Sequence, residues 1–453
     1  MSYSVIKFEQ ITDPEDRKNI EFLRTVTEKC KKQLIAAGAT RFAGSAGRTT
    51  SNEFNVDGGK FSLFRTQFSD SLSLTCYIGD KKGTASVSSS LTVEENISSA
   101  VNDAIASAKA AEPDPDWVVA PKEENKIFLS GSTDFDKDLF FNRTVEAMEE
   151  IKRRYPLIIM EQAIANHGRS CNVYFNSSGT EFITISGSYV TDFMYSAHDG
   201  DNASSFVGNE FCLESLDKPF LDVGYLAKTL ENTEKQIYTT PFKGKKVGKL
   251  IATPGLVSEF LSTALDDFTG DYNILNGTSI WLNKLGQQVA DPRLTVSLKT
   301  NDSRFVGGQA YTGEGFLTED YNIIDKGILT AFSLSAYVAS KTGKKRAPNS
   351  GENMVVEKGS KSIEDIIKET EFGIYVARFS GGEPAVNGDF SGVAKNSFLV
   401  ENGKITVPLS ETMISGNLAD LLNNVVDISS EQEITGSEVI PYICFDGVTI
   451  SGE

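Results

Sequence analysis

Apolar positions recur at helical spacing in the segment VSEFLSTALDDF, which runs from Val257 to Phe268. The apolar set is Val257, Leu261, Ala264, Leu265 and Phe268, and it predicts a helix with one buried face. Turn-forming residues precede this helix at 253–255 and follow it at 269–271. Its polar face offers only hydroxyl and carboxylate groups, from Ser262, Thr263, Asp266 and Asp267.

The amino-terminal region opens with a second helical pattern. Asp13 followed by Pro14 is typical of a helix start, and Gly38 is typical of a helix end. The predicted inner stripe is Leu23, Val26, Cys30, Leu34 and Ala37. Thr92 and Glu95 have the spacing of a capping box and predict another helix, which stops before Pro113.

Strand patterns lie between these two helices. Alternating residues predict strands at 61–68 and 72–78, then a turn at 79–83 and a further strand from Thr84. The order of helix and strands repeats beyond an acidic, proline-rich connection at 112–117.

The repeat begins with a predicted helix at 138–154, with an inner face of Phe141, Val145, Met148 and Ile151. Strands are predicted at 157–165, 170–176 and 181–196. We therefore expect an N-terminal domain, 1–240, built from two related helix-plus-hairpin halves, 1–112 and 127–240.

Short strands separated by glycine turns dominate the remainder of the chain, 241–453. Turns are predicted at 325–327, 387–389 and 401–403, and they favour a mostly antiparallel sheet or barrel. Few helices are expected there: the one at 257–268, one capped by Ser362 and closed by Gly373, and one near 417–424. The predicted fold class is α+β.

Charge narrows the possible partners. The chain has 44 Lys and Arg against 62 Asp and Glu, a net charge of −18, which argues against direct nucleic-acid binding. The basic clusters at 243–249 and 341–346 are interpreted as solvated loops. Five separated cysteines indicate a reducing compartment, and no export signal or membrane-spanning run is found, so a cytoplasmic protein is expected.

Four motifs in the C-terminal half carry a family resemblance: GTSIWLNKLGQQVADPRLTV from Gly277, YNIIDKGILTAFSLSAYVASKTG from Tyr321, FGIYVARFSGG from Phe372 and FLVENGKITVPLSETMISGNL from Phe398. With them the chain resembles the TldD/PmbA family, once called modulators of DNA gyrase and regarded as peptidases and peptide-maturation proteins. The segments GDKKGTASVSS and EPDPDW extend the resemblance over nearly the whole chain.

The resemblance also implies where a zinc site would lie. In the TldD branch the helix corresponding to 257–268 carries H-E-x-x-G-H, which binds zinc and supplies a general base. Counting from the shared Gly277-Thr278-Ser279, these positions are occupied here by Ser262, Thr263 and Asp267. The TldD cysteine segment G-x-C-G-K is also missing, and Cys444 lies in an apolar run that predicts a buried strand.

The chain's two histidines, His167 and His198, lie in the N-terminal half, away from the predicted helix. We interpret both as hydrogen-bonding or surface residues rather than ligands or catalytic groups. The chain therefore resembles the PmbA branch, also called TldE, whose members lack the zinc motif.

This resemblance implies a subunit without zinc or another cofactor, inactive alone, that joins a TldD-type zinc-bearing subunit to enclose unfolded peptides. Exposed backbone beside Gly313, Gly315, Gly381 and Gly382 is the expected peptide contact. The alternatives are a non-enzymatic peptide-binding or gyrase-modulating homodimer and a divergent hydrolase. A carboxylate metal site at Asp266, Asp267 and Asp271 is disfavoured because its spacing fits no calcium loop.

Overall fold

The computed structural model describes residues 2–351, 353–382, 384–410 and 412–452. Its first sheet has nine strands within these ranges, in the order β1-β5-β7-β6-β2-β3-β4, with β8 and β9 also paired to β7. The strands are β1 (Tyr3–Ile6), β2 (Arg41–Asp57), β3 (Lys60–Ile78), β4 (Lys81–Val87), β5 (Lys126–Gly131), β6 (Ile158–Asn176), β7 (Glu181–Asp199), β8 (Asn202–Ala203) and β9 (Val207–Leu213).

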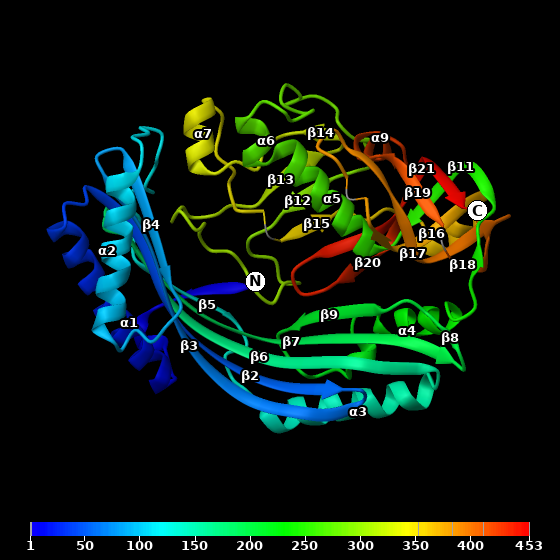
Figure 1. The fold of residues 1–453 in the computed structure, drawn as a ribbon, viewed down its shortest axis with the longest axis horizontal. Helices are drawn as coiled ribbons and strands as arrows, with labels where there is room; N and C mark the ends of the chain where they lie inside the picture. The colour runs from blue at the N-terminus through cyan, green and yellow to red at the C-terminus, as the bar shows by residue number, and fades with distance from the viewer. Residues whose placement is uncertain (1, 352, 383, 411, 453) are drawn as a thin grey trace.

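Within the described residues, four α-helices accompany this sheet: α1 (Pro14–Ala36), α2 (Glu94–Ala110), α3 (Lys137–Arg154) and α4 (Leu226–Lys235). One face of β2, β6 and β7 carries the apolar residues of two cores. At one end this face packs against α1 and α2, and at the other end it packs against α3. Figure 1 shows the long curved sheet with α1 and α2 beyond one end and α3 beneath the other. The opposite face is turned toward the C-terminal part of the chain.

Several predicted elements of this region need correction. The strands predicted at 61–68 and 72–78 are one strand, β3, and those at 157–165 and 170–176 are one strand, β6. β2 was not predicted at all. The polar centres of β2 and β6 stay in the sheet because their backbone is paired on both sides, whereas that of β3 is paired with β2 alone. Charges are also paired, as Arg48 is with Asp70 at 2.8 Å.

The helix details are partly confirmed. Asp13 caps α1 through the backbone N–H of Glu15, as predicted, but Ala37 lies outside the helix and is exposed. The capping box at Thr92 is wrong, because Val93 is the cap residue and the Thr92 hydroxyl bonds to Ser90.

The inner face of α3 is also rotated from the prediction. Its buried residues are Phe140, Thr144, Ala147 and Ile151, whereas Phe141 is exposed. The polar Thr144 can be buried because its hydroxyl donates to the carbonyl of Phe140 at 2.9 Å.

The second sheet has twelve strands in the described part of the chain. They are β10 (Thr240–Pro241), β11 (Gly244–Ala252), β12 (Val296–Leu298), β13 (Tyr321–Asp325), β14 (Ile328–Leu329), β15 (Met354–Val356), β16 (Phe372–Ser380), β17 (Asp389–Glu401), β18 (Lys404–Ser410), β19 (Met413–Asn417), β20 (Val425–Ile434) and β21 (Val439–Gly452). β17, β16, β11, β21 and β19 pair in a closed ring, so the predicted barrel is confirmed.

Five helices lie with this sheet: α5 (Pro254–Thr269), α6 (Asp271–Leu275), α7 (Ala336–Thr342), α8 (Ile363–Lys368) and α9 (Leu418–Asn423). The predicted helix at 257–268 is confirmed as α5, and its whole predicted apolar face is buried in the barrel core. Ser362 caps α8 as predicted, but the helix ends at Lys368, because the chain enters β16 before Gly373. In the described part of the chain, we find no helix whose length and apolar character would allow it to span a membrane.

The acidic connection at 112–117 contacts α7 in the C-terminal part of the chain. Asp114 accepts hydrogen bonds from Tyr337 and Lys341 of α7, at 2.8 and 2.7 Å. Trp117 stacks on Tyr337 with ring centroids 3.7 Å apart. Lys341 is therefore an ion-pairing residue of α7, which corrects its interpretation as part of a solvated loop.

A second contact between the two regions involves Gly315. Tyr174 of β6 donates a hydrogen bond to the carbonyl of Glu314 at 2.9 Å, and a Cβ at Gly315 would overlap the Tyr174 hydroxyl. Gly315 has a φ of +91°, which strains any residue with a side chain.

We predict that Gly315→Ala lowers the free energy of unfolding by about 2–4 kcal/mol, because it combines overlap with backbone strain. Gly313→Ala is the matched control: a Cβ there meets no atom within 4 Å, so a change below about 1 kcal/mol is expected. Urea denaturation of both variants measures the difference. Equal stabilities would contradict the role given to the Tyr174 contact.

Candidate functional site

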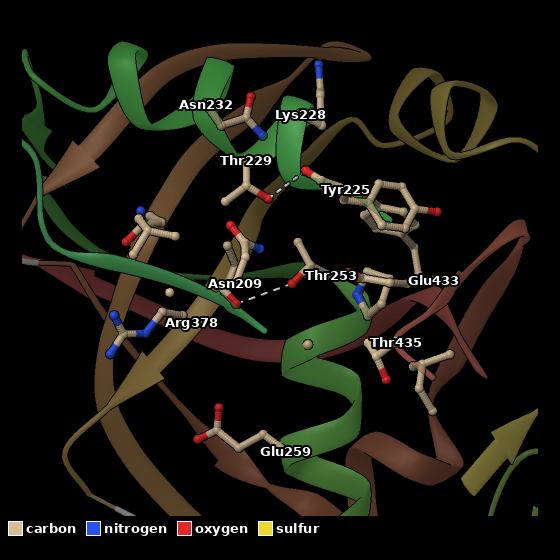
Figure 2. A pocket seen from close by; sticks show the side chains of 18 of the residues that line it. Asn209, Tyr225, Lys228, Thr229, Asn232, Thr253, Glu259, Arg378, Glu433 and Thr435 are labelled. Atoms are coloured by element: carbon tan, nitrogen blue, oxygen red, sulfur yellow. Dashed lines mark hydrogen bonds between the residues drawn. The ribbon is translucent and has the colours of Figure 1, made fainter. Parts of the chain in front are cut away.

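A cavity of about 320 Å³ lies between the two sheets, and we call it the α5 cavity. Its walls come from β9 and α4 on one side and from the start of α5, β16 and the β20–β21 hairpin on the other. Figure 2 shows Asn209 and Arg378 on one side of this space and Tyr225, Glu433 and Thr435 on the other. The cavity thus joins residues that are more than 200 positions apart in the sequence.

The first turn of α5 forms one wall. Thr253 holds the helix start against β16, because its backbone N–H donates to Val376 and its hydroxyl to Ala377, at 3.1 and 3.2 Å. Gly255 and Glu259, one helical turn apart, line the cavity. Ser258 donates a hydrogen bond to Glu438 at 2.7 Å, which ties α5 to the start of β21.

Acidic groups dominate the charged lining. Four carboxylates, those of Glu210, Glu259, Glu433 and Glu438, face the cavity with two cations, Lys228 and Arg378. Burial, together with the charge of Glu438, raises the pKa of Glu433 to about 7. Glu433 is therefore half-protonated near neutral pH and able to exchange a proton with a ligand.

Three tyrosines border the same carboxylate. Tyr225 packs edge-on against Tyr442, with ring centroids 5.7 Å apart, and Tyr375 lies 6.3 Å from Tyr442. Burial, followed by the charges of Glu433 and Glu431, raises the pKa of Tyr225 to about 12, so its phenol stays protonated. The aromatic wall is neutral and offers ring faces and hydroxyl groups.

The residues predicted from the zinc motif lie on α5, beyond the cavity. Ser262 is exposed, the Thr263 hydroxyl donates to the carbonyl of Glu259 at 2.9 Å, and Asp267 accepts from Asn273 at 3.3 Å. They continue the helix face that carries Glu259, but none of them lines the α5 cavity. Asp271, the third member of the acidic cluster, accepts the backbone N–H of Ser335 instead.

The four predicted glycines are dispersed. Gly313 lines a separate cavity of about 320 Å³ near α6 and α7, whereas Gly315 is buried against Tyr174. Gly381 and Gly382 form the exposed turn after β16. Their contact with peptide stays a prediction.

His167, His198 and Cys444 lie outside the lining of the α5 cavity. His167 in β6 is buried, with Nε2 3.1 Å from the carbonyl of Ser132, and burial lowers its pKa. His198 in β7 hydrogen-bonds to Ser196 at 3.0 Å. Cys444 is buried in β21, as the apolar run predicted.

Sequence reasoning missed Glu433, Glu438, Asn396 and the three tyrosines. The only signal in the sequence is the set of acids in SSEQEITGSE, at 429–438, next to an apolar strand. That pattern is equally typical of an exposed hairpin, so it did not indicate a site.

Comparison with known proteins identifies the family. Residues 245–452 match the family model described as the PmbA/TldA metallopeptidase C-terminal domain. A metalloprotease PmbA homolog of Buchnera aphidicola is 31% identical over 196 residues, covering 43% of this chain and 44% of that protein. A PmbA homolog of Haemophilus influenzae is 26% identical over 400 residues, covering 84% and 85%. The chain belongs to the TldD/PmbA family.

The fold agrees with this TldD/PmbA assignment. The crystal structure of TldE from Thermococcus kodakarensis superposes with a TM-score of 0.79 over 95% of this chain and 100% of that one, at 19% identity. At this identity the likeness establishes the fold alone. The matched segments span 44% of the Buchnera aphidicola protein and 41% of the metalloprotease PmbA of Escherichia coli O157:H7, which is 30% identical over 184 residues.

The residues at the positions that the family resemblance assigns to zinc do not fit zinc. Zinc in proteins is held by imidazole, thiolate and carboxylate groups, and two of the three positions carry hydroxyls that are exposed or bonded to backbone. Within the described ranges, no group of three or more His, Cys, Asp or Glu is placed to hold a metal ion. We therefore derive no metal-dependent step for this chain.

The raised pKa of Glu433 predicts a pH-dependent stability. Its folded-state pKa exceeds the unfolded value of about 4.3, so the folded chain binds this proton more tightly. The free energy of unfolding then falls as pH rises from about 4.5 to 7.

Glu433→Gln removes this pH-dependent contribution to the free energy of unfolding. Between pH 5 and pH 8 we therefore expect the free energy of unfolding of the variant to rise by about 1–3 kcal/mol relative to that of the parent. Chemical denaturation at both pH values measures it, with the exposed Glu371→Gln as control. Parallel pH profiles for parent and Glu433→Gln would show that Glu433 is not the titrating group.

Proposed function

We propose that this chain is a zinc-free subunit of a TldD/PmbA-type peptidase, which binds unfolded peptide and pairs with a TldD-type zinc-bearing subunit. The observation that carries the proposal is that Ser262, Thr263 and Asp267 occupy the α5 positions that the family resemblance assigns to zinc ligands. A cavity of about 320 Å³ lies between the two sheets at the start of the same helix. The metalloprotease names of its relatives supply the reaction class, cleavage of peptide bonds.

The cavity supports peptide binding within this proposal. Its polar walls and its volume of about 320 Å³ suit one or two amino-acid residues. Pro254 and Gly255 of the first turn of α5 line this space. The N–H groups of a first helical turn have no partner within the helix, so that of Gly255 is a candidate donor to a peptide carbonyl oxygen.

The edge of the first sheet supports a subunit contact. β4 pairs with β3 only at Leu72–Ile78, and in the described part of the chain no strand covers the edge of β3 from Lys60 to Ser71. Four apolar side chains on this stretch are at least 40% exposed: Phe61, Leu63, Phe64 and Phe68. A long uncovered edge with apolar side chains is a surface that pairs with another chain.

We predict that the purified chain alone does not cleave an unfolded peptide, and that adding it to the zinc-bearing subunit of the same cell raises cleavage at least about tenfold over that subunit alone. Chelator should abolish the activity of the mixture, because the zinc belongs to the partner. Heat-denatured chain is the control. Chelator-resistant cleavage by this chain alone would point to a divergent hydrolase, and the absence of a complex would favour the peptide-binding homodimer.

The subunit contact has its own test. Phe68 is 78% exposed, and Phe68→Glu places a charge on the uncovered edge, so association with the zinc-bearing subunit should weaken at least about tenfold. Tyr272→Glu, at a side chain of α6 that is 77% exposed, is the matched control and should leave association unchanged. Sedimentation velocity measures both, and equal association would remove β3 from the interface.

A further inference from the structure

The carboxylate of Glu433 lies in an aromatic surround at one end of the α5 cavity. Tyr225, Tyr375 and Tyr442 line the same cavity as Glu433, with the rings of Tyr225 and Tyr375 centred 5.7 and 6.3 Å from that of Tyr442. Glu433 and Tyr225 also line a second cavity, of about 620 Å³, on the other side of the β20–β21 hairpin. The cluster is therefore reached from two spaces rather than sealed in a core.

The carboxylates of this cluster have no cationic partner among the described residues. Neither Glu433 nor Glu438 forms an ion pair with a lysine or arginine in the residues that the structure describes. Lys228 pairs with Glu231 on the surface of α4, and Arg378 donates to the carbonyl of Phe206 at 2.8 Å. Burial and then the charge of Glu438 disfavour ionisation of Glu433, and a cationic ligand relieves that penalty.

A strained residue on the cavity wall gives an independent indication of a ligand. Asn396 has a φ of +49° and only 8% of its surface exposed, yet its Oδ1 accepts no hydrogen bond from any described residue. A buried carboxamide in the left-handed region costs stability both through its backbone and through the missing partner. Such costs concentrate at ligand sites.

The positive charge of Arg378 is separated from the carboxylate of Glu433. Arg378 lies on the opposite side of the cavity from Glu433 in Figure 2. A cation is therefore repelled by Arg378 and attracted to the carboxylate and ring faces around Glu433. Carboxylates combined with aromatic faces are a recurrent way of binding ammonium and guanidinium groups.

We propose that Glu433 and Glu438, with Tyr225, Tyr375 and Tyr442, form a binding site for a cationic group of a peptide. The group is an ammonium or guanidinium, from a lysine or arginine side chain or from the peptide amino terminus. This inference deepens the proposed function and rests on it for the peptide. The site belongs to this chain alone, so its test needs neither the partner nor zinc.

The experiment measures binding of four matched short unstructured peptides to the full chain at pH 8 by calorimetry. One is acetylated with a single internal lysine, one has a free amino terminus and no basic residue, one is acetylated and neutral, and one is acetylated with a single aspartate. We expect at least one cationic peptide to bind about tenfold or more tightly than the neutral one. The double variant Glu433→Gln/Glu438→Gln should abolish that difference, whereas Glu371→Gln should preserve it.

The four peptides distinguish a side-chain ammonium group from a terminal one. Preference for the lysine peptide assigns the site to side chains, and preference for the free amino terminus assigns it to terminal ammonium groups. Equal binding of the neutral peptide, tighter binding of the aspartate peptide, or a preference that survives in the double variant would each overturn the proposal. A cooperative thermal transition at or above the parent's melting temperature shows that the double variant is folded. Intact binding without partner association would refute the subunit role alone.

Discussion

The α5 cavity depends on one close backbone contact between the two sheets. The N–H of Cys212 in β9 donates to the carbonyl of Thr435 at 3.0 Å, and the next residue, Gly436, lies so close that a Cβ would overlap the Cys212 carbonyl oxygen. Gly436 has a φ of +92° and its own carbonyl accepts from Val306 at 2.9 Å. This contact fixes the turn that carries Glu433 before it and Glu438 after it.

The α5 cavity contains local arrangements that destabilise the folded chain. Two carboxylates are brought together with incomplete solvation, and Asn396 is held in a left-handed conformation with an unmatched oxygen. The barrel core offsets this destabilisation. The buried side of α5 packs in that core, where Leu256, Phe260 and Phe268 are enclosed. Departures from local rules of this kind are expected where a protein binds ligands.

Sequence patterns predicted the elements whose signal is local. The buried face of α5, the Asp13 cap and the tight turn at 401–403, where Asn402 has a φ of +50°, follow from residues close together in the chain. The long strands β2, β3 and β6 were missed or divided, because their polar centres are stabilised by partners far away, such as Asp16 for Arg169 at 2.7 Å. The α5 cavity was missed for the same reason: Tyr225 and Tyr442 meet only after both sheets have formed. Its chemistry is a property of the tertiary structure.

The central claim is that this chain binds peptide beside α5 without holding zinc there. Its most direct test is a crystal structure of the chain grown with zinc chloride and a lysine-containing peptide, with diffraction recorded on both sides of the zinc absorption edge. We predict peptide density between Glu433 and Tyr442 and no anomalous peak beside Ser262, Thr263 or Asp267. An anomalous peak coordinated by Asp267, with the α5 cavity empty of peptide, would contradict the account.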